Sequence, residues 1–193
     1  MANILYFNLT NVKEAKGGRP QTVMFKTGGL KPNGTIIKTL KDTMEKDGRE
    51  LDHVHDVEFI SGGKVDSVIG KWVIAVPEIV AQQYRIIDDK AWQFALEQYE
   101  TYPAYQLQAL DRLEYSEAHF ASIAGLAVGD YVNIDTNGKF AKEGSGNAQN
   151  SAFRVVSIMD VTKPVVLAAN ASKTQPAAFI PQLGKMIKLE VVR

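Results

Sequence analysis

The chain of 193 residues contains no cysteine. Without thiols it cannot form disulfides, thiolate zinc sites or iron–sulfur clusters, and it has no cysteine nucleophile. It also lacks an apolar run near the roughly 20 residues of a membrane helix. Its first residues do not show the basic start of a signal peptide. We therefore expect a soluble protein that is made in the cytoplasm and has no membrane partner.

The chain has no net charge, because 22 basic residues balance 22 acidic ones. The charges are nevertheless unevenly distributed: residues 1–40 carry +5, residues 41–120 carry −8 and residues 121–193 carry +3. Opposite charges of this kind could pair between neighbouring copies and set their orientation. They could equally be solvated surfaces within one molecule, because sequence charge says little about assembly.

Motifs for catalysis or metal binding are also missing. There is no nucleophile elbow, no HExxH, and no phosphate loop, because the glycine pairs near Lys31 and Lys64 lack the required spacing. His53 and His55 would share one face of a strand, but three metal ligands are not assured. His119 stands alone and is expected at a surface or interface. We predict a protein that is not an enzyme, with no catalytic residue, no metal, no cofactor and no small-molecule substrate.

The first 120 residues predict a mixed α+β region. Alternating apolar residues indicate strands, and an Asn-Gly turn follows Pro32. The spacing of Trp92, Ala95, Leu96 and Tyr99 predicts a helix, and the leucines at 107, 110 and 113 predict a second, shorter one. Residues 41–52 are interpreted as a loop or short helix. The predicted strands of this region cover residues 3–10, 22–27, 35–37, 54–60 and 65–76.

Residues 121–193 carry the clearest pattern. Alternation over 131–135 is followed by a Thr-Asn-Gly-Lys turn at 136–139, which is a preferred hairpin sequence. Further strands are predicted over 152–161, 164–169 and 186–192. Short strands separated by turns favour a small β-barrel or sandwich domain in residues 121–193. The fold class is therefore predicted as mainly β with minor α, and the domain boundary lies after residue 120.

This part of the chain resembles the small β domains of tailed-bacteriophage virion proteins, particularly capsid decoration (cement) and head-fibre proteins. The resemblance covers about 70 residues, written as LAVGDYVNIDTNGKFAKEGSG, AFRVVSIMDV and GKMIKLEVVR. It is carried by a strand after a Gly-Asp turn, a hairpin, a variable loop, a strand that starts with Phe and a terminal strand. The residues that carry it are Gly129, Asp130, Val132, Gly138, Phe153, Val155 and 187–191.

The resemblance implies a structural protein of the virion without an active site. Its partners would be the major capsid protein and neighbouring copies of itself, and it would stabilise the shell by decorating or bridging capsid subunits. Residues in polar loops are the least constrained by packing in the core, so we expect the contacts with partners in loops 13–20, 28–34 and 143–151. The predicted contact residues are Lys13, Lys16, Arg19, Lys31, Asn33, Lys142, Glu143 and Asn147.

Two alternatives stay open. The chain could belong to a head–tail connector or a tail rather than to the capsid. It could instead be a small barrel that binds a single-stranded nucleic acid through stacked aromatic and basic side chains. The aromatic candidates are Tyr131, Phe140, Phe153 and Phe179, with Lys139, Lys142 and Arg154 nearby. A balanced charge disfavours the nucleic-acid alternative, and we interpret the aromatic residues as core residues.

Overall fold

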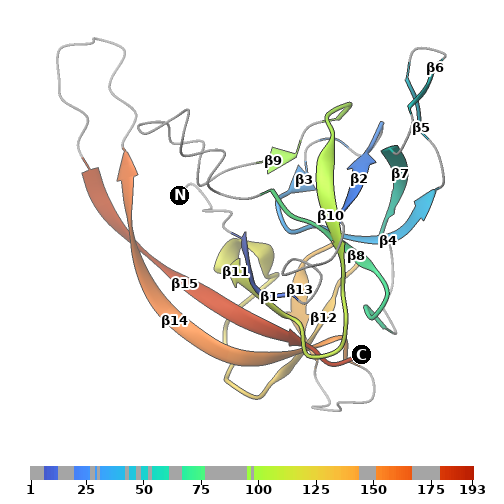
Figure 1. Cartoon of the computed structure of the whole chain (residues 1–193). Helices are drawn as coiled ribbons and strands as arrows, with labels where there is room; N and C mark the ends of the chain where they lie inside the picture. Colours follow the sequence, from blue (N-terminus) through green and yellow to red (C-terminus); the bar gives the residue numbers. More distant parts are fainter. Residues whose placement is uncertain are drawn as a thin grey trace, which may run out of the picture.

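The computed structural model describes a mainly β protein, which confirms the predicted fold class. Its strands form a closed five-stranded barrel, a six-stranded sheet and two small two-stranded sheets (Figure 1). The structure describes residues 7–12, 20–26, 29, 31–41, 44–46, 49–51, 54–60, 67–76, 95–96, 98–143, 151–166 and 179–193. Within these residues, no helix is long and apolar enough to cross a membrane.

The barrel is built from the N-terminal half of the chain. Its strands close in the order β10-β2-β7-β4-β8, and β8 returns to pair with β10. Strands β2 and β7 run parallel, and the other pairs run antiparallel. The strands are β2 (Gln21–Met24), β4 (Ile36–Lys41), β7 (Val54–Phe59), β8 (Trp72–Ile74) and β10 (Tyr102–Gln106).

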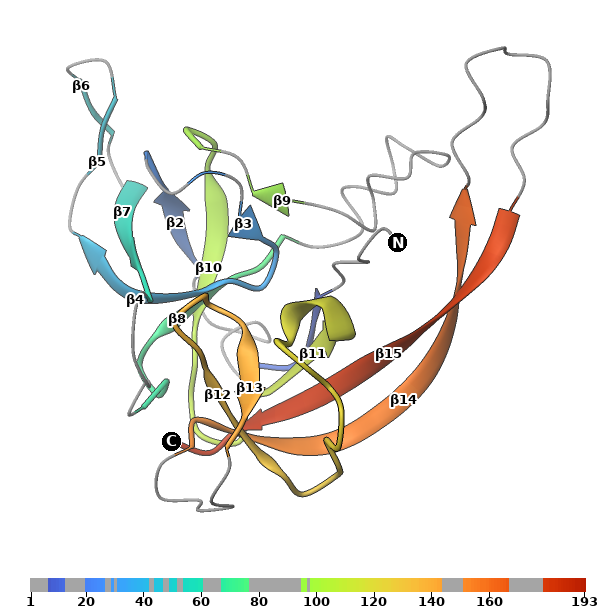
Figure 2. The same cartoon turned by 180° about the vertical axis from the view of Figure 1, so that it is seen from behind.

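The six-stranded sheet joins the start of the chain to its end, in the order β1-β11-β15-β14-β12-β13. Its pairs are antiparallel. Strands β14 and β15 are much longer than the rest and form a curved hairpin that sweeps away from the barrel (Figure 2). The strands are β1 (Phe7–Asn11), β11 (Arg112–Ser116), β12 (Tyr131–Ile134), β13 (Phe140–Lys142), β14 (Phe153–Val166) and β15 (Phe179–Val191).

The closed barrel therefore lies in residues 21–106, whereas residues 121–193 contribute four strands to the open sheet. That sheet takes β1 and β11 from the other side of the predicted boundary after residue 120. The hairpin at 136–139 and the strands on either side of it lie where the sequence places them. The division of the chain into two folding units at residue 120 stays a prediction.

The predicted helices are wrong where the structure describes them. Ala95 and Leu96 form β9 (Ala95–Leu96), which pairs with β3 (Lys31–Pro32), while Trp92 lies outside the described residues. The second expected helix is replaced by β10, a turn and β11. Leu107 and Leu113 are buried at the two sides of this turn, and Leu110 is exposed in it with a positive φ. Leu107 and Leu113, buried on either side of a tight turn, therefore have a sequence spacing that also fits a helix.

Two smaller elements complete the described fold. Strands β5 (Met44–Lys46) and β6 (Arg49–Leu51) pair antiparallel, where a loop or short helix was expected over 41–52. A 3₁₀ helix, η3 (Glu117–His119), follows β11 and lies against β15. Gly70 lies in a turn before β8 with φ +80°, within the range predicted as a strand over 65–76.

Barrel and sheet share an apolar interface because β4 and β8 bury both of their faces. Ile37 and Ile74 belong to the cluster inside the barrel. Their neighbours Ile36 and Val73 belong to the cluster that includes the core of the sheet. Strands buried on both faces have consecutive apolar residues, as these two do. The turn that precedes β4 is therefore held directly against the sheet.

Candidate functional site

The turn that connects β3 to β4 docks on the six-stranded sheet. Gly34 has φ +86°, and a Cβ there would clash with Cδ2 and Cγ of the Phe7 ring and lie 2.8 Å from Cε1 of Tyr115. The hydroxyl of Tyr115 donates a hydrogen bond of 2.9 Å to the carbonyl of Gly34. The amide of Asn33 donates to the carbonyl of Val76 and its oxygen accepts from the Val76 N–H, at 3.1 and 3.0 Å. The turn is thus fixed to both parts of the molecule.

His119, in η3, lies at the same contact between the turn and the sheet, which we call the junction. Its Nε2 lies 3.1 Å from the carbonyl oxygen of Asn33, so Nε2 must carry the proton, and Nδ1 accepts from the hydroxyl of Ser116 at 3.2 Å. Burial lowers the pKa of His119 to about 4, and the charge of Lys139 acts in the same direction. The imidazole is therefore neutral at neutral pH. The expectation of a histidine at a surface or interface is wrong, because His119 is buried inside the molecule.

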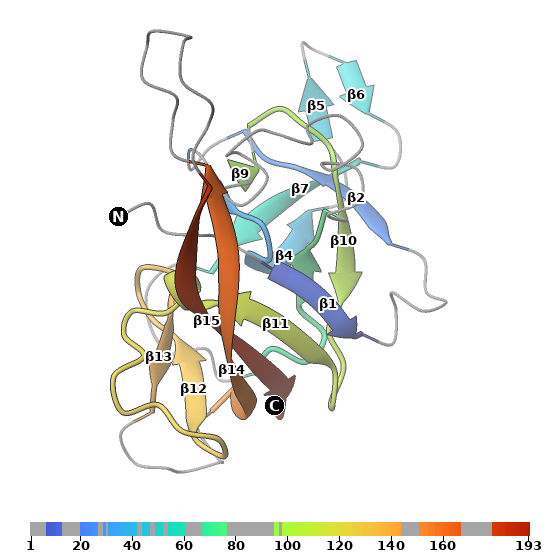
Figure 3. The ribbon, with the colours of Figure 1, turned by 90° about the vertical axis from the view of Figure 1, so that its left-hand side faces the viewer.

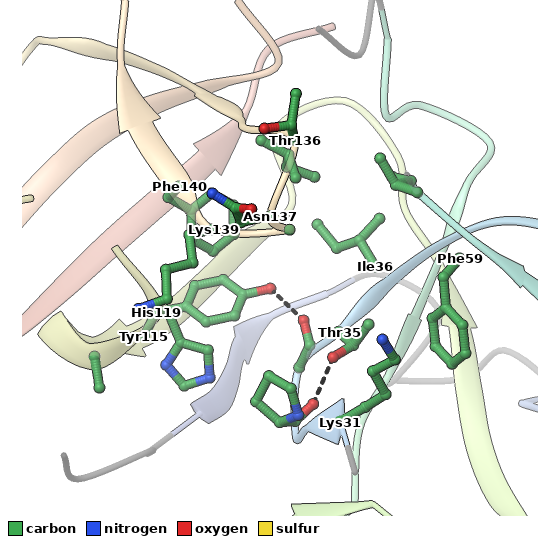
Figure 4. A pocket seen from close by; sticks show the side chains of 16 residues that line it. Lys31, Thr35, Ile36, Phe59, Tyr115, His119, Thr136, Asn137, Lys139 and Phe140 are labelled. Atoms are coloured by element: carbon green, nitrogen blue, oxygen red, sulfur yellow. Dashed lines mark hydrogen bonds between the residues drawn. The ribbon is translucent and has the colours of Figure 1, made fainter. Parts of the chain in front are cut away.

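A cavity of about 520 Å³ lies beside this junction, between the barrel and the sheet (Figure 4). Its size falls within the usual range for small-molecule pockets, about 300–1,000 Å³. Its described walls come from β3, β4 and the end of β7 on the barrel side, and from β11, η3 and the β12–β13 hairpin on the other. The described lining residues are Lys31, Pro32, Gly34, Thr35, Ile36, Phe59, Ile60, Tyr115, Ala118, His119, Ile134, Thr136, Asn137, Gly138, Lys139 and Phe140.

The cavity rim is rigid on the sheet side. The Asp135 carboxylate accepts hydrogen bonds of 2.8 Å from the N–H groups of Asn137 and Lys139. The hairpin predicted from the sequence is present, but its loop has three residues rather than two. The Asp135 N–H donates to the carbonyl of Lys139, and Gly138, with φ +75°, donates its N–H to the carbonyl of Asp135. Lys31 faces the cavity from the barrel side, where its ammonium lies 4.8 Å from the centroid of the Phe59 ring. Lys31 and Lys139 line the cavity from different walls (Figure 4).

The hairpin of β14 and β15 forms the second notable feature, and we call residues 159–166 and 179–186 the arm. From Met159↔Met186 outward the two strands pair with each other as far as Val166↔Phe179. Beyond the pair of Ser116 with Met186, no other described strand extends the sheet along the arm. Figures 1 and 2 show it curving away from the barrel, and Figure 3 views it from its outer side. Met159 is 42% exposed, and Asp160 pairs with Lys185 at 2.9 Å on the surface.

The arm carries a proline pair that protects its edges. Pro164 lies directly opposite Pro181. Proline has no N–H, so the two residues cannot exchange backbone hydrogen bonds. They therefore form a non-hydrogen-bonded pair, in which the backbone N–H positions and carbonyls point to the outer edges of the ribbon. At this pair, each outer edge of the arm therefore lacks one backbone N–H donor. Prolines at such positions block the addition of further strands.

Four predicted contact residues lie within the described structure, and their side chains are engaged within the fold. Lys142 contacts the Asp130 carboxylate and the Gly125 carbonyl at 2.6 and 2.8 Å, and Glu143 accepts a bond from Asn133. The bond from Lys142, followed by that from the Ala127 N–H, lowers the pKa of Asp130. Asn33 is buried, so the prediction of an exposed contact there is wrong. Lys31 is half-buried at the cavity.

The remaining predicted contact residues, Lys13, Lys16, Arg19 and Asn147, lie outside the described residues. The same holds for His53, whereas Nε2 of His55 lies 3.1 Å from the side-chain oxygen of Gln21. Among the described residues, no group of three or more side chains could hold a metal ion. Lys31 lines the same cavity as the β12–β13 hairpin, which sequence reasoning had placed in a separate domain.

Sequence reasoning missed Tyr115 and His119 altogether as residues of the junction. The local signal was slight: the sequence Ala-His-Phe at 118–120 surrounds the imidazole with apolar side chains. The aromatic candidates for nucleic-acid stacking are clearer, because Phe140 and Phe153 are buried and pack edge to face at 5.3 Å. The interpretation as core residues is confirmed for Phe140 and Phe153, whereas Tyr131 is half-buried and the side chain of Phe179 lies outside the described part of the structure.

Comparison with known proteins finds no relative: no family model, no curated protein and no solved structure matches this chain.

Proposed function

We propose that this chain is a non-enzymatic structural protein of a tailed-phage virion, which binds and stabilises the capsid shell by decorating or bridging capsid subunits. Its partners are the major capsid protein and neighbouring copies. The observation that supports this proposal is the arm of β14 and β15, which projects beyond the sheet as a two-stranded ribbon.

Beyond the pair of Ser116 with Met186, no other described strand pairs with either edge of the arm. A two-stranded hairpin is at best marginally stable in water when nothing packs on it. Its exposed Met159 presents an apolar side chain at the base of the projecting part. Packing of the arm against a neighbouring subunit would supply the missing support, and the proline pair makes its faces the contact surface rather than its edges.

The test is fractionation of the protein from cells that carry its gene. We expect the chain to sediment in a density gradient with icosahedral particles, identified by electron microscopy. Met159→Glu places a charge on the arm without touching the core, and it should move the chain into the free fraction. Ile69→Glu is the matched control, because Ile69 is 44% exposed in a turn near the C-terminal end of the sheet.

The proposal would be supported if the Ile69→Glu control sediments with the particles and Met159→Glu does not. A chain that never accompanies particles would overturn it. Co-purification with nucleic acid, with an affinity that falls steeply as salt rises, would favour the single-strand-binding alternative instead. Sedimentation with tails or connectors would retain a virion role and move it away from the shell.

A further inference from the structure

We propose that the cavity at the barrel–sheet junction is a binding site for a carboxylate carried on an apolar body. This inference goes beyond the structural role proposed above, and its test needs only the purified chain. The ligand chemistry has two sources, a free aliphatic carboxylate or a glutamate side chain flanked by apolar residues on a partner protein.

The charge of the cavity favours an anion. Lys31 and Lys139 approach it from opposite parts of the molecule, and neither forms an ion pair with another described residue. No carboxylate is found among the described residues that line it. His119, which also lines it, is neutral because it is buried. With no carboxylate among the described lining residues, the positive charges of these two lysines favour a negative group in the cavity.

The rest of the lining favours an apolar body. Ile36, Ile60 and Phe59 supply an apolar wall on the barrel side, and Ile134 and Phe140 supply one on the sheet side. A few polar groups at the rim of a mostly apolar cavity are the usual arrangement for orienting a small ligand. A carboxylate bound at either lysine would place its hydrocarbon part against these walls.

The site is already formed without ligand. The Lys139 backbone is fixed by the Asp135 carboxylate, and the Lys31 side chain is positioned over the Phe59 ring. The floor at Tyr115 and His119 is tied by hydrogen bonds to the turn at residues 33–34. Little conformational freedom is lost on binding to a preformed site, which favours affinity.

The experiment is titration with two probes, each paired with a neutral analogue. Decanoate is compared with decanamide, and acetyl-Leu-Glu-Leu-amide with acetyl-Leu-Gln-Leu-amide, by calorimetry and by nitrogen-15 NMR. We expect at least one anionic probe to bind about tenfold or more tightly than its neutral analogue, a ratio that corresponds to about 1.4 kcal/mol. The amide signals of residues 31–36 and 136–140 should shift on binding.

Three variants locate the site. The double variant Lys31→Met, Lys139→Met keeps both aliphatic stems and removes both charges, so it should bind the anionic probe at least tenfold more weakly. Lys188→Met on β15 removes a lysine outside the cavity and should bind as the wild type does. Thr136→Trp fills the exposed rim and should abolish binding. Circular dichroism and the unfolding midpoint verify that each variant is folded.

Each outcome decides the proposal. Binding of decanoate alone assigns the site to a small carboxylate, binding of the peptide alone assigns it to a partner side chain, and binding of both supports the shared chemistry. The absence of binding by either probe overturns it, as does equal loss in Lys188→Met and the double variant. Because no particle is involved, failure here would leave the virion proposal intact, and failure of the virion test would leave this site intact.

Discussion

Gly34 is the residue on which the junction of barrel and sheet depends most directly. Its positive φ is a conformation that other residues adopt at a cost, and its missing Cβ leaves room for two aromatic rings. The ring centroids of Phe7 and Tyr115 are 4.8 Å apart, and Tyr115 also donates a hydrogen bond to the Gly34 carbonyl. Backbone conformation and side-chain packing therefore require glycine at this position independently of each other.

We predict that Gly34→Ala lowers the free energy of unfolding by about 3 kcal/mol or more, from left-handed strain and overpacking combined. Urea unfolding followed by circular dichroism measures this change. Gly70→Ala is the control: Gly70 has φ +80° but nothing within 4 Å of its added Cβ. That variant should lose only the strain, about 1 kcal/mol. Equal losses in the two variants would contradict the packing argument.

His119 makes stability depend on pH. Between pH 6.5 and about pH 4 the unfolded chain binds a proton at this imidazole that the folded chain does not bind. The free energy of unfolding should therefore fall as pH falls through this interval, by up to about 3 kcal/mol. His119→Gln keeps a side-chain N–H for the Asn33 carbonyl but does not titrate. The difference between wild type and variant should shrink with rising acidity, and parallel curves from chemical denaturation would contradict this.

At the scale of elements, the arm of β14 and β15 combines exposure with protection against strand addition. A long projecting ribbon has two unpaired edges, which are templates for aggregation. The opposed Pro164 and Pro181 remove one outward donor from each edge. The arm can then remain extended in the free protein without pairing with another arm.

We predict that Pro164→Ala with Pro181→Ala promotes self-association, because each substitution restores an N–H at an outer edge. Sedimentation velocity at increasing protein concentration should show larger species, and thioflavin T fluorescence should reveal cross-β structure if association continues. Val161→Ala on the same strand adds no donor and should sediment as the wild type does. An unchanged sedimentation profile of the double variant would remove the protective role of the prolines.

The elements that could be predicted from the sequence are the local ones. The β12–β13 hairpin depends on the alternation of residues 131–134 and a turn that accepts positive φ at Gly138, and both signals lie within ten residues. The strand Val54–Phe59 is likewise visible as alternation. The leucines at 107 and 113 fit a helix by spacing, but Leu107 is buried just after β10 and Leu113 is buried in β11, on the other side of a turn. Spacing alone does not distinguish these two arrangements.

The arrangement that could not be predicted is the one that brings distant segments together. The barrel is closed by the pairing of β8 with β10. The open sheet takes its edge strand β1 from the start of the chain, which pairs with β11 more than 100 residues away in sequence. The cavity depends on this arrangement, because Lys31 and Lys139 belong to different sheets. Alternation indicates that a strand has a buried face, but it does not identify its partner strand.

At the scale of the whole molecule, the barrel and the sheet should unfold as one unit. Ile36 and Val73 extend the barrel strands into the core of the sheet, and the buried hydroxyl of Tyr115 donates across the interface to the carbonyl of Gly34. Removal of that hydroxyl leaves a buried acceptor without its partner, at a cost of about 1–3 kcal/mol. If the two parts are coupled, this cost applies to both.

We therefore predict that Tyr115→Phe lowers the opening free energy of amides in β4 and β8 of the barrel as much as that of amides in β11 and β15 of the sheet. Native-state hydrogen exchange measures the two groups separately. Tyr105→Phe in β10 is the control, because Tyr105 is partly buried and its hydroxyl makes no hydrogen bond of this kind to Gly34. Protection lost only in the sheet would mean that the barrel is stable by itself. Equal loss in both would show that a single hydrogen bond at the junction contributes to the stability of the entire fold.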